Sequence, residues 1–201
     1  MIVIGVTGSF GTGKSTVARM LGDLGAVVLD ADETVHELMR PGTPVWSRIR
    51  RTFGQEVLTS SGEINRKRLG KIVFGDPAML RRLNRIVHPA VRQRFRQRIA
   101  AIKRRDPTAV VVLDVPLLIE AGSQYRIDVL VVVSAPLSAV ARRLRQRSGL
   151  RLKDVRKIRS YQMPLRQKER MADFIVKNDG SLEATRRRVV RMWKKILKEK
   201  G

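Results

Sequence analysis

The sequence contains no cysteine, few aromatic residues and no long apolar run, and each absence excludes a class of function. Without cysteine the chain has no disulfide framework and no thiolate for metal or redox chemistry. Aromatic residues make up only 4% of its 201 residues, too few for the stacked set that binds single-stranded nucleic acid. No apolar run approaches the roughly 18 residues of a membrane-spanning helix, and the chain begins without a basic leader. We therefore expect a cytoplasmic protein without a membrane partner.

Acidic residues are also scarce relative to basic ones. The chain has 18 Asp and Glu against 42 Lys and Arg, a formal net charge of +24. Such a field attracts polyanions, including nucleic acids, anionic membranes and phosphorylated metabolites. Alternatively, many of the basic residues form solvated helix faces, because they are spread along the chain rather than gathered in one tail. The charge alone does not select a partner.

Apolar runs rich in Val and Ile predict five buried strands. Each run is followed by turn residues or by a helical pattern, and strands that alternate with helices form a parallel sheet through right-handed crossovers. The predicted fold class is therefore α/β, with a parallel sheet flanked by helices. The predicted strands are residues 2–7, 26–30, 109–115, 128–134 and 173–176.

Two long helical stretches interrupt the predicted strands. Residues 33–107 show a helical pattern too long for a crossover, which predicts a helical substrate-binding insertion beside the sheet. Residues 137–171 are dense in Arg and Lys and break near Ser148-Gly149, as expected of a mobile lid. We expect residues 1–201 to form one domain that includes both parts. The last helix, residues 182–197, should bury one apolar face made of Leu182, Val189, Val190, Trp193, Ile196 and Leu197.

A glycine-rich loop follows the first predicted strand. Residues 8–15, GSFGTGKS, match the pattern G-x-x-x-x-G-K-[ST] at every position, and an apolar-periodic helix follows. The glycines let backbone N–H groups converge on phosphate oxygens, and the helix N-terminus adds its positive dipole end. In this motif Lys14 reaches the β- and γ-phosphates and the Ser15 hydroxyl binds Mg²⁺. The loop predicts a P-loop NTPase type of sheet; the alternative is a glycine-rich turn that matches by chance.

Carboxylates stand at the ends of two other predicted strands. Asp30 and Asp32 follow the run 26–29 and would project on the same side if the chain stays extended. One could then order water around Mg²⁺ while the other accepts a proton from an incoming hydroxyl; alternatively, Asp32 only caps a helix. Asp114 ends the run 110–113, where it would act on the metal through water or merely cap the strand.

The predicted lid carries a run of arginines. On residues 137–147 an apolar stripe occupies one face, whereas Arg143 and Arg147 are four residues apart and share another. Two guanidinium groups on one face could clamp transferring phosphates. A solvated charged face is the alternative, and spacing alone leaves both open.

In their order along nearly the whole chain, these motifs resemble those of the dephospho-CoA kinase family. The phosphate loop is common to many families, but the segments Asp30-Ala31-Asp32, His88-Pro89 and Asp114-Val115-Pro116-Leu117-Leu118 in this order are specific. The other matches are Phe53-Gly54, Asn65-Arg66 with Leu69, Phe74, Ile119-Glu120, Arg143 with Arg147, Gln162-Met163-Pro164-Leu165 with Lys168, Ala172-Asp173 and Asn178-Asp179-Gly180-Ser181.

The resemblance implies a reaction, its partners and its site residues. The family transfers the γ-phosphoryl group of ATP, with Mg²⁺, to the ribose 3′-hydroxyl of dephospho-CoA, the final step of coenzyme A synthesis. Both partners are small molecules, and no nucleic acid is expected. By this resemblance Asp32 is the catalytic base, and Lys14 and Arg143 act on the transferring group. The implied ATP-binding residues are Gly11, Thr12, Gly13, Lys14, Ser15, Thr16, Arg143 and Asn178; the substrate-binding residues are Asp32, His88, Leu117 and Glu120; the metal-binding residues are Ser15 and, through water, Asp114.

Some positions depart from the family's pattern. Val140 stands where the family often has Gln, and Ser148 where it has an acidic residue. Ile158 stands where the family has Arg, although Arg159 is beside it. These departures leave the lid contacts other than that of Arg143 open. Two rival functions also stay open: another nucleoside or nucleotide kinase, and a P-loop nucleic-acid-binding switch, which the net charge permits.

Overall fold

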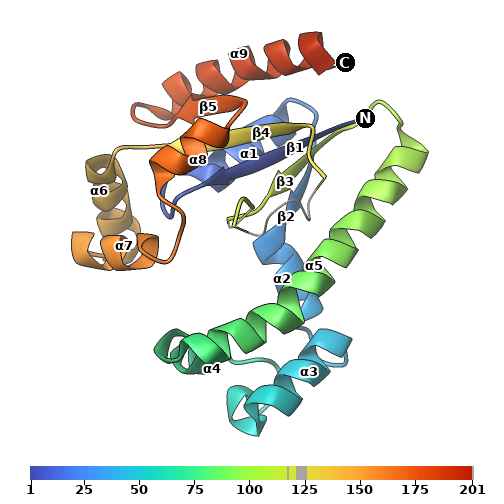
Figure 1. The fold of residues 1–201 in the computed structure, drawn as a ribbon, viewed down its shortest axis with the longest axis vertical. Helices are drawn as coiled ribbons and strands as arrows, with labels where there is room; N and C mark the ends of the chain where they lie inside the picture. The colour runs from blue at the N-terminus through green and yellow to red at the C-terminus, as the bar shows by residue number, and fades with distance from the viewer. Residues whose placement is uncertain (117, 121–125, 201) are drawn as a thin grey trace. The chain divides into compact units, whose positions relative to one another are not determined.

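The computed structural model describes residues 1–116, 118–120 and 126–200. The chain forms two compact units, drawn in Figure 1. The sheet unit comprises Met1–Asp30 and Ala101–Gly201, and the helical unit comprises Ala31–Ala100.

One five-stranded parallel sheet forms the centre of the sheet unit, with the strand order β2-β3-β1-β4-β5. In the register, Asp114 on β3 lies opposite both Val6 on β1 and Asp30 on β2. The carboxyl ends of these three strands therefore meet at one edge of the sheet. All five predicted strands are confirmed, with ends that shift by one residue at most. The strands are β1 (Ile2–Gly8), β2 (Val27–Asp30), β3 (Val110–Asp114), β4 (Val129–Ser134) and β5 (Phe174–Lys177).

Helices α1 (Lys14–Asp23) and α9 (Leu182–Lys200) contact each other and share one apolar core with the strands. The apolar face predicted for the last helix is only partly correct. Val189 and Ile196 are buried as predicted. Leu182 and Leu197 are 65% and 39% exposed, because the buried face follows helical spacing through Val189 and Ile196 and takes in Thr185 and Met192 instead.

The predicted lid region forms three helices, α6 (Leu137–Ser148), α7 (Leu152–Arg159) and α8 (Leu165–Met171). The predicted break lies at Gly149, which ends α6 with a φ of 68°, a left-handed conformation that glycine adopts easily. Val140 of α6 and Val155 of α7 are fully buried in a small cluster, and Phe10 of the phosphate loop packs against it. This region is therefore packed onto the phosphate loop in the structure.

The helical unit contains α2 (Ala31–Leu38), α3 (Pro44–Phe53), the short 3₁₀ helix η1 (Gln55–Val57), α4 (Arg66–Gly75) and most of α5 (Pro77–Arg105). Figure 1 shows that α5 is bent, as expected for a helix with a proline, Pro89, in its interior. Within the described part of the chain, no helix combines the length and apolarity needed to cross a membrane. The buried apolar side chains of the unit include Ile49, Phe53, Val57, Leu69, Val73, Val87, Val91 and Phe95.

Candidate active site

The phosphate loop joins β1 to α1, and its conformation requires glycine at two positions. Gly11 and Gly13 have φ angles of 77° and 88°, which other residues rarely adopt. Thr12 closes the loop, because its N–H and its hydroxyl both donate to the carbonyl of Ser9, at 3.2 and 2.9 Å. Helix α1 begins at Lys14. Loop N–H groups and a helix N-terminus thus come together, which is the arrangement that binds phosphate.

Lys14 forms an ion pair with Asp114, whose side chain is 1% exposed. Burial raises the pKa of Asp114, and the charge of Lys14 and hydrogen bonds from Lys14 and Ser15 oppose that rise. The negative charge of Asp30, its neighbour in the sheet register, raises this pKa further. The sheet edge therefore carries a lysine, a hydroxyl and two carboxylates within one small region.

This set of groups fits Mg²⁺ bound together with a nucleotide. Such sites use one or two carboxylates or a hydroxyl, and water and substrate phosphates supply the remaining ligands. Ser15 and Asp114 provide these groups and already contact each other. Across the described residues no group of three or more His, Asp or Glu gathers.

Asn178 and Arg143 support the phosphate loop from outside it. Asn178 is buried; its amide donates to the carbonyl of Thr12 at 2.8 Å, and its amide oxygen accepts from the hydroxyl of Thr185 at 3.0 Å. Arg143 donates to the carbonyl groups of Asn178 and Gly180 at 2.9 and 3.2 Å. The ATP contacts that the family resemblance implies for Asn178 and Arg143 stay predictions.

Two of the residues predicted to bind the acceptor lie in the segment after β3. Glu120 accepts a hydrogen bond from the N–H of Met163 at 3.0 Å and pairs with the fully buried Lys168 at 2.8 Å. This carboxylate therefore joins the segment after β3 to α8 and the residues before it. Leu117 lies outside the described residues.

Asp32 lies in the first turn of α2, which begins at Ala31. The extended chain on which a shared side for Asp30 and Asp32 depended is therefore not what forms, because the backbone turns into a helix immediately after β2. Asp32 is exposed. It interacts electrostatically with Arg66, and its charge opposes the lowering of the Arg66 pKa that burial causes.

His88 lies in the interior of α5, directly before Pro89, and is half-buried. Burial lowers the pKa of His88, and the charge of Arg92 one turn later lowers it further. The imidazole is therefore neutral at physiological pH, when it can both donate and accept a hydrogen bond.

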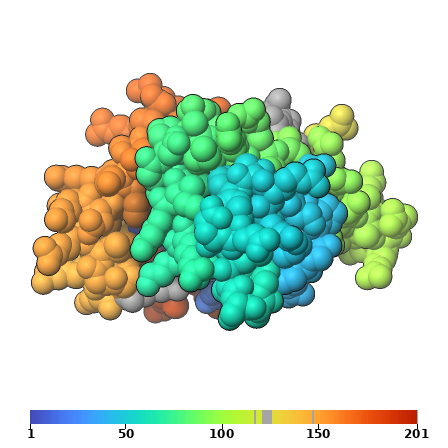
Figure 2. Space-filling view, turned by 90° about the horizontal axis from the view of Figure 1, so that it is seen from below, coloured from blue at the N-terminus to red at the C-terminus, as the bar shows by residue number. Residues whose placement is uncertain are grey.

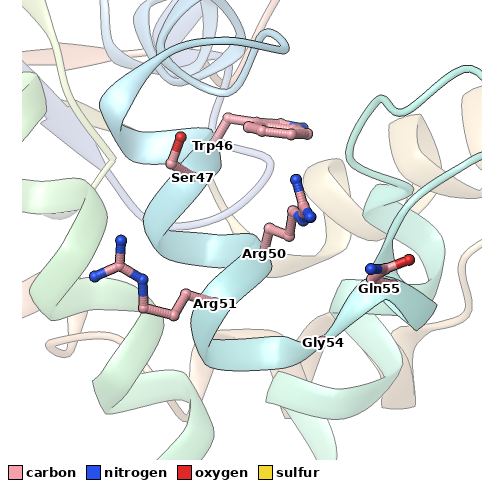
Figure 3. A pocket seen from close by; sticks show the side chains of 6 residues that line it. All are labelled: Trp46, Ser47, Arg50, Arg51, Gly54 and Gln55. Carbon is pink, nitrogen blue, oxygen red and sulfur yellow. The ribbon is translucent and has the colours of Figure 1, made fainter.

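The helical unit carries a cavity of about 390 Å³ on α3 and η1, which the sequence analysis missed (Figure 3). The guanidinium of Arg50 lies 5.5 Å from the ring centroid of Trp46, and the indole N–H donates to the carbonyl of Gly62 at 2.8 Å. Figure 2 shows this segment, in cyan, at the surface. A tryptophan and an arginine four residues apart on one helix were the available signal. The cavity is lined by Trp46, Ser47, Arg50, Arg51, Gly54 and Gln55.

Two further residues of the predicted lid contact the phosphate loop and were not assigned from the sequence. Arg159 donates from Nε to the carbonyl of Phe10 at 3.1 Å, and the N–H of Phe10 donates to Gln162 at 2.8 Å. The match of Gln162 to a family motif was a signal for one of them. For Arg159 the signal was its place in a basic run, beside Ile158, where the family has Arg.

A phosphate loop that follows the central strand of a parallel sheet, with its lysine paired to a carboxylate on the neighbouring strand, is the arrangement of a P-loop nucleotide-binding protein. The family model described as dephospho-CoA kinase matches residues 2–184. The chain belongs to the dephospho-CoA kinase family.

Individual relatives match nearly the whole chain. A dephospho-CoA kinase of Syntrophotalea carbinolica is 43% identical over 197 residues, which cover 98% of this chain and 93% of the relative. A solved structure from Thermus thermophilus is 34% identical, with a TM-score of 0.82 and coverage of 100% of this chain and 98% of the other. The solved dephospho-CoA kinase from Campylobacter jejuni is 26% identical, with a TM-score of 0.72 and coverage of 99% and 98%.

Proposed function

We propose that the chain transfers the γ-phosphoryl group of ATP to the ribose 3′-hydroxyl of dephospho-CoA, giving coenzyme A and ADP. The observation that carries this proposal is the phosphate loop, whose Lys14 is paired with the buried Asp114, in a chain of the dephospho-CoA kinase family. Phosphoryl transfer requires little covalent chemistry from the protein, so positioning and charge stabilisation are its main tasks.

The backbone of residues 11–16 holds the ATP phosphates, and Lys14 and Arg143 stabilise charge on the transferring group. Arg143 has five N–H groups. Only two of them are used on the carbonyls of Asn178 and Gly180, which leaves donors for a phosphate. Asn178 lies under the loop at Thr12 and contacts the adenine. The family resemblance supports each of these roles, and the loop's geometry supports the phosphate contacts of residues 11–16.

Asp32 accepts the proton of the 3′-hydroxyl as that oxygen attacks. Its exposed position in the first turn of α2 leaves the carboxylate accessible to an acceptor. His88, Leu117 and Glu120 are the other residues to which the family resemblance gives a role in binding the acceptor. The contacts of Glu120 with Met163 and Lys168 both use Oε1, so Oε2 is the oxygen that we assign to the acceptor.

Ser15 and, through water, Asp114 would hold Mg²⁺ when the nucleotide binds. The metal would neutralise charge on the β- and γ-phosphates. The pairing of Lys14 with Asp114 in the structure keeps both groups in place at the sheet edge.

The purified chain, given ATP, Mg²⁺ and dephospho-CoA, should form coenzyme A and ADP in equal amounts, measured by chromatography with mass detection. Nucleosides and nucleoside monophosphates offered as acceptors under the same conditions should be phosphorylated far more slowly. Faster phosphorylation of a nucleoside or a monophosphate would contradict the proposed acceptor. Steeply salt-dependent RNA binding without any coenzyme A would favour the nucleic-acid-binding alternative.

A further inference from the structure

Phe10, the third residue of the phosphate loop, is held by three contacts with the predicted lid. Its ring packs against the cluster that contains Val140 and Val155. Its N–H donates to Oε1 of Gln162 at 2.8 Å, and its carbonyl accepts from Nε of Arg159 at 3.1 Å. The position of the loop at Phe10 therefore depends on α6, α7 and the segment after α7.

The guanidinium of Arg159 also contains a buried donor without a partner. Among the described residues, its Nη2 is the one buried side-chain nitrogen or oxygen that makes no hydrogen bond. Burial lowers the pKa of Arg159, but a guanidinium still keeps its charge at neutral pH. Buried donors in folded proteins nearly always have a partner, and an unpaired one on a charged group is especially costly. This position therefore suits an anionic ligand.

The direction of the unpaired N–H follows from the geometry of the guanidinium. Nε–H and one N–H of Nη2 lie parallel on the same edge of the planar group, and this fork matches carboxylates and phosphates. Because Nε donates to the carbonyl of Phe10, the parallel N–H of Nη2 also points toward the phosphate loop. Arg143 differs, because its Nη1 and Nη2 are both bonded to backbone carbonyls.

We propose that Arg159 is a nucleotide-contacting residue that holds the phosphate loop with Nε and donates from Nη2 to a phosphate oxygen of the bound nucleotide. The proposal rests on the proposed function to the extent that the loop must bind a nucleoside di- or triphosphate. It requires neither a particular acceptor nor turnover.

Binding of ATP and ADP, measured by calorimetric titration without acceptor, tests this role. Arg159→Ala removes both arms of the fork, whereas Arg159→Lys keeps the charge and one donor. Loss of a hydrogen bond to a charged group should weaken ADP and ATP binding roughly 10- to 100-fold in Arg159→Ala. We expect a smaller loss in Arg159→Lys. Arg156→Ala, an exposed arginine on the same helix, is the matched control and should bind as the unmodified chain does.

A second variant separates contact with the nucleotide from support of the loop. Gln162→Ala loosens Phe10 but leaves the guanidinium of Arg159 in place. If Arg159 contacts phosphate, Arg159→Ala should lose more ADP affinity than Gln162→Ala, and the salt dependence of ADP binding should fall only in Arg159→Ala. Equal losses with equal salt dependence would overturn the proposal and leave Arg159 as a loop support only.

Thermal unfolding of each variant without nucleotide checks that it folds, and Arg159→Lys decides the question if Arg159→Ala does not fold. ADP affinity in Arg159→Lys equal to that of the unmodified chain would then overturn the proposal. Coenzyme A formation is measured separately on the unmodified chain. A chain that binds ATP through Arg159 but forms no coenzyme A would contradict the proposed function and leave this proposal standing.

Discussion

The two units of the chain hold their candidate functional side chains in different ways. In the sheet unit several of these side chains are bonded to one another or to the backbone: Lys14 pairs with the buried Asp114, and the buried Asn178 bonds to the phosphate loop. In the helical unit the candidate side chain of Asp32 is exposed and that of His88 is half-buried. The core of that unit consists of other residues, among them the buried Phe95.

This difference predicts how substitutions act in each unit. In the sheet unit the interactions that shape the nucleotide site are also interactions that stabilise the fold, so a substitution should change binding and stability together. In the helical unit an exposed functional side chain can be replaced without opening a cavity, so catalysis and stability should separate. Each experiment below tests one side of this difference.

Lys14→Ala should have the largest effect. Loss of the lysine removes charge stabilisation at the transferring phosphate, and kcat/KM for ATP should fall by roughly 10³-fold or more. It also leaves Asp114 buried without its cation, so the free energy of unfolding should drop by about 1–3 kcal/mol. Steady-state kinetics and urea unfolding measure the two effects. Arg19→Ala, an exposed position on the same helix, is the control; an undamaged Lys14→Ala would reject the phosphate-loop assignment.

Asp32→Asn should lower the rate of phosphoryl transfer without lowering stability, whereas Lys14→Ala should lower both. Removal of the proton acceptor should lower kcat roughly 10²- to 10⁴-fold. ATP affinity and the midpoint of thermal unfolding should stay near their original values, because Asp32 is exposed. Single-turnover kinetics and ATP titration measure the two properties. Glu33→Gln changes the exposed neighbour in the same helical turn and is the control; it should leave kcat and stability nearly unchanged. Intact turnover in Asp32→Asn would show that the base is another group.

The stability contributions of Asp114 and His88 should depend on pH with opposite signs. The pKa of Asp114 is raised above 3.8 by burial, so between 3.8 and the folded pKa the folded state binds more protons and stability falls as pH rises. The pKa of His88 is lowered below 6.5 by burial, so between the folded pKa and 6.5 the unfolded state binds more protons and stability rises with pH.

Urea unfolding over a pH series, with Asp114→Asn and His88→Gln, measures these two contributions. As pH falls below 6.5, the unmodified chain should lose stability relative to His88→Gln. As pH falls toward 3.8, the unmodified chain should gain stability relative to Asp114→Asn. A change of the same sign in both comparisons would contradict the burial that causes the two pKa shifts.

The sheet and the phosphate loop could be predicted because local sequence determines them. Five runs rich in Val and Ile became five strands, since a buried parallel strand needs little more than an uninterrupted apolar segment. The break in the predicted lid was also local, because Gly149 takes a left-handed conformation at the end of α6. The glycines of the phosphate loop were a local signal as well, because Gly11 and Gly13 take positive φ angles that favour glycine.

Other features depended on contacts between distant segments and could not be predicted. An extended Asp30-Ala31-Asp32 and a helix that begins at Ala31 fit the same sequence, and the helix is what forms. In the basic run of the lid, the family resemblance favoured Arg143, but nothing local shows that Arg143 bonds to two carbonyls or that Arg159 reaches Phe10. Side-chain partners more than 30 residues away are set by the fold, not by spacing.

Gly75→Ala and Gly25→Ala should change stability the least. One lies in each unit, away from the candidate functional residues, so the pair compares the two backbones alone. A Cβ would meet no atom within 4 Å at either glycine. Neither substitution therefore causes a steric clash, and the two sites differ only in backbone conformation. Gly25, in the sheet unit, has a φ of 104°, and alanine there should cost about 1–2 kcal/mol. Gly75 ends α4 in the helical unit, where alanine should stabilise by about 0.5 kcal/mol because it restricts the unfolded chain. Urea unfolding with unchanged m-values measures both, and a neutral Gly25→Ala would show that this turn can adopt another conformation.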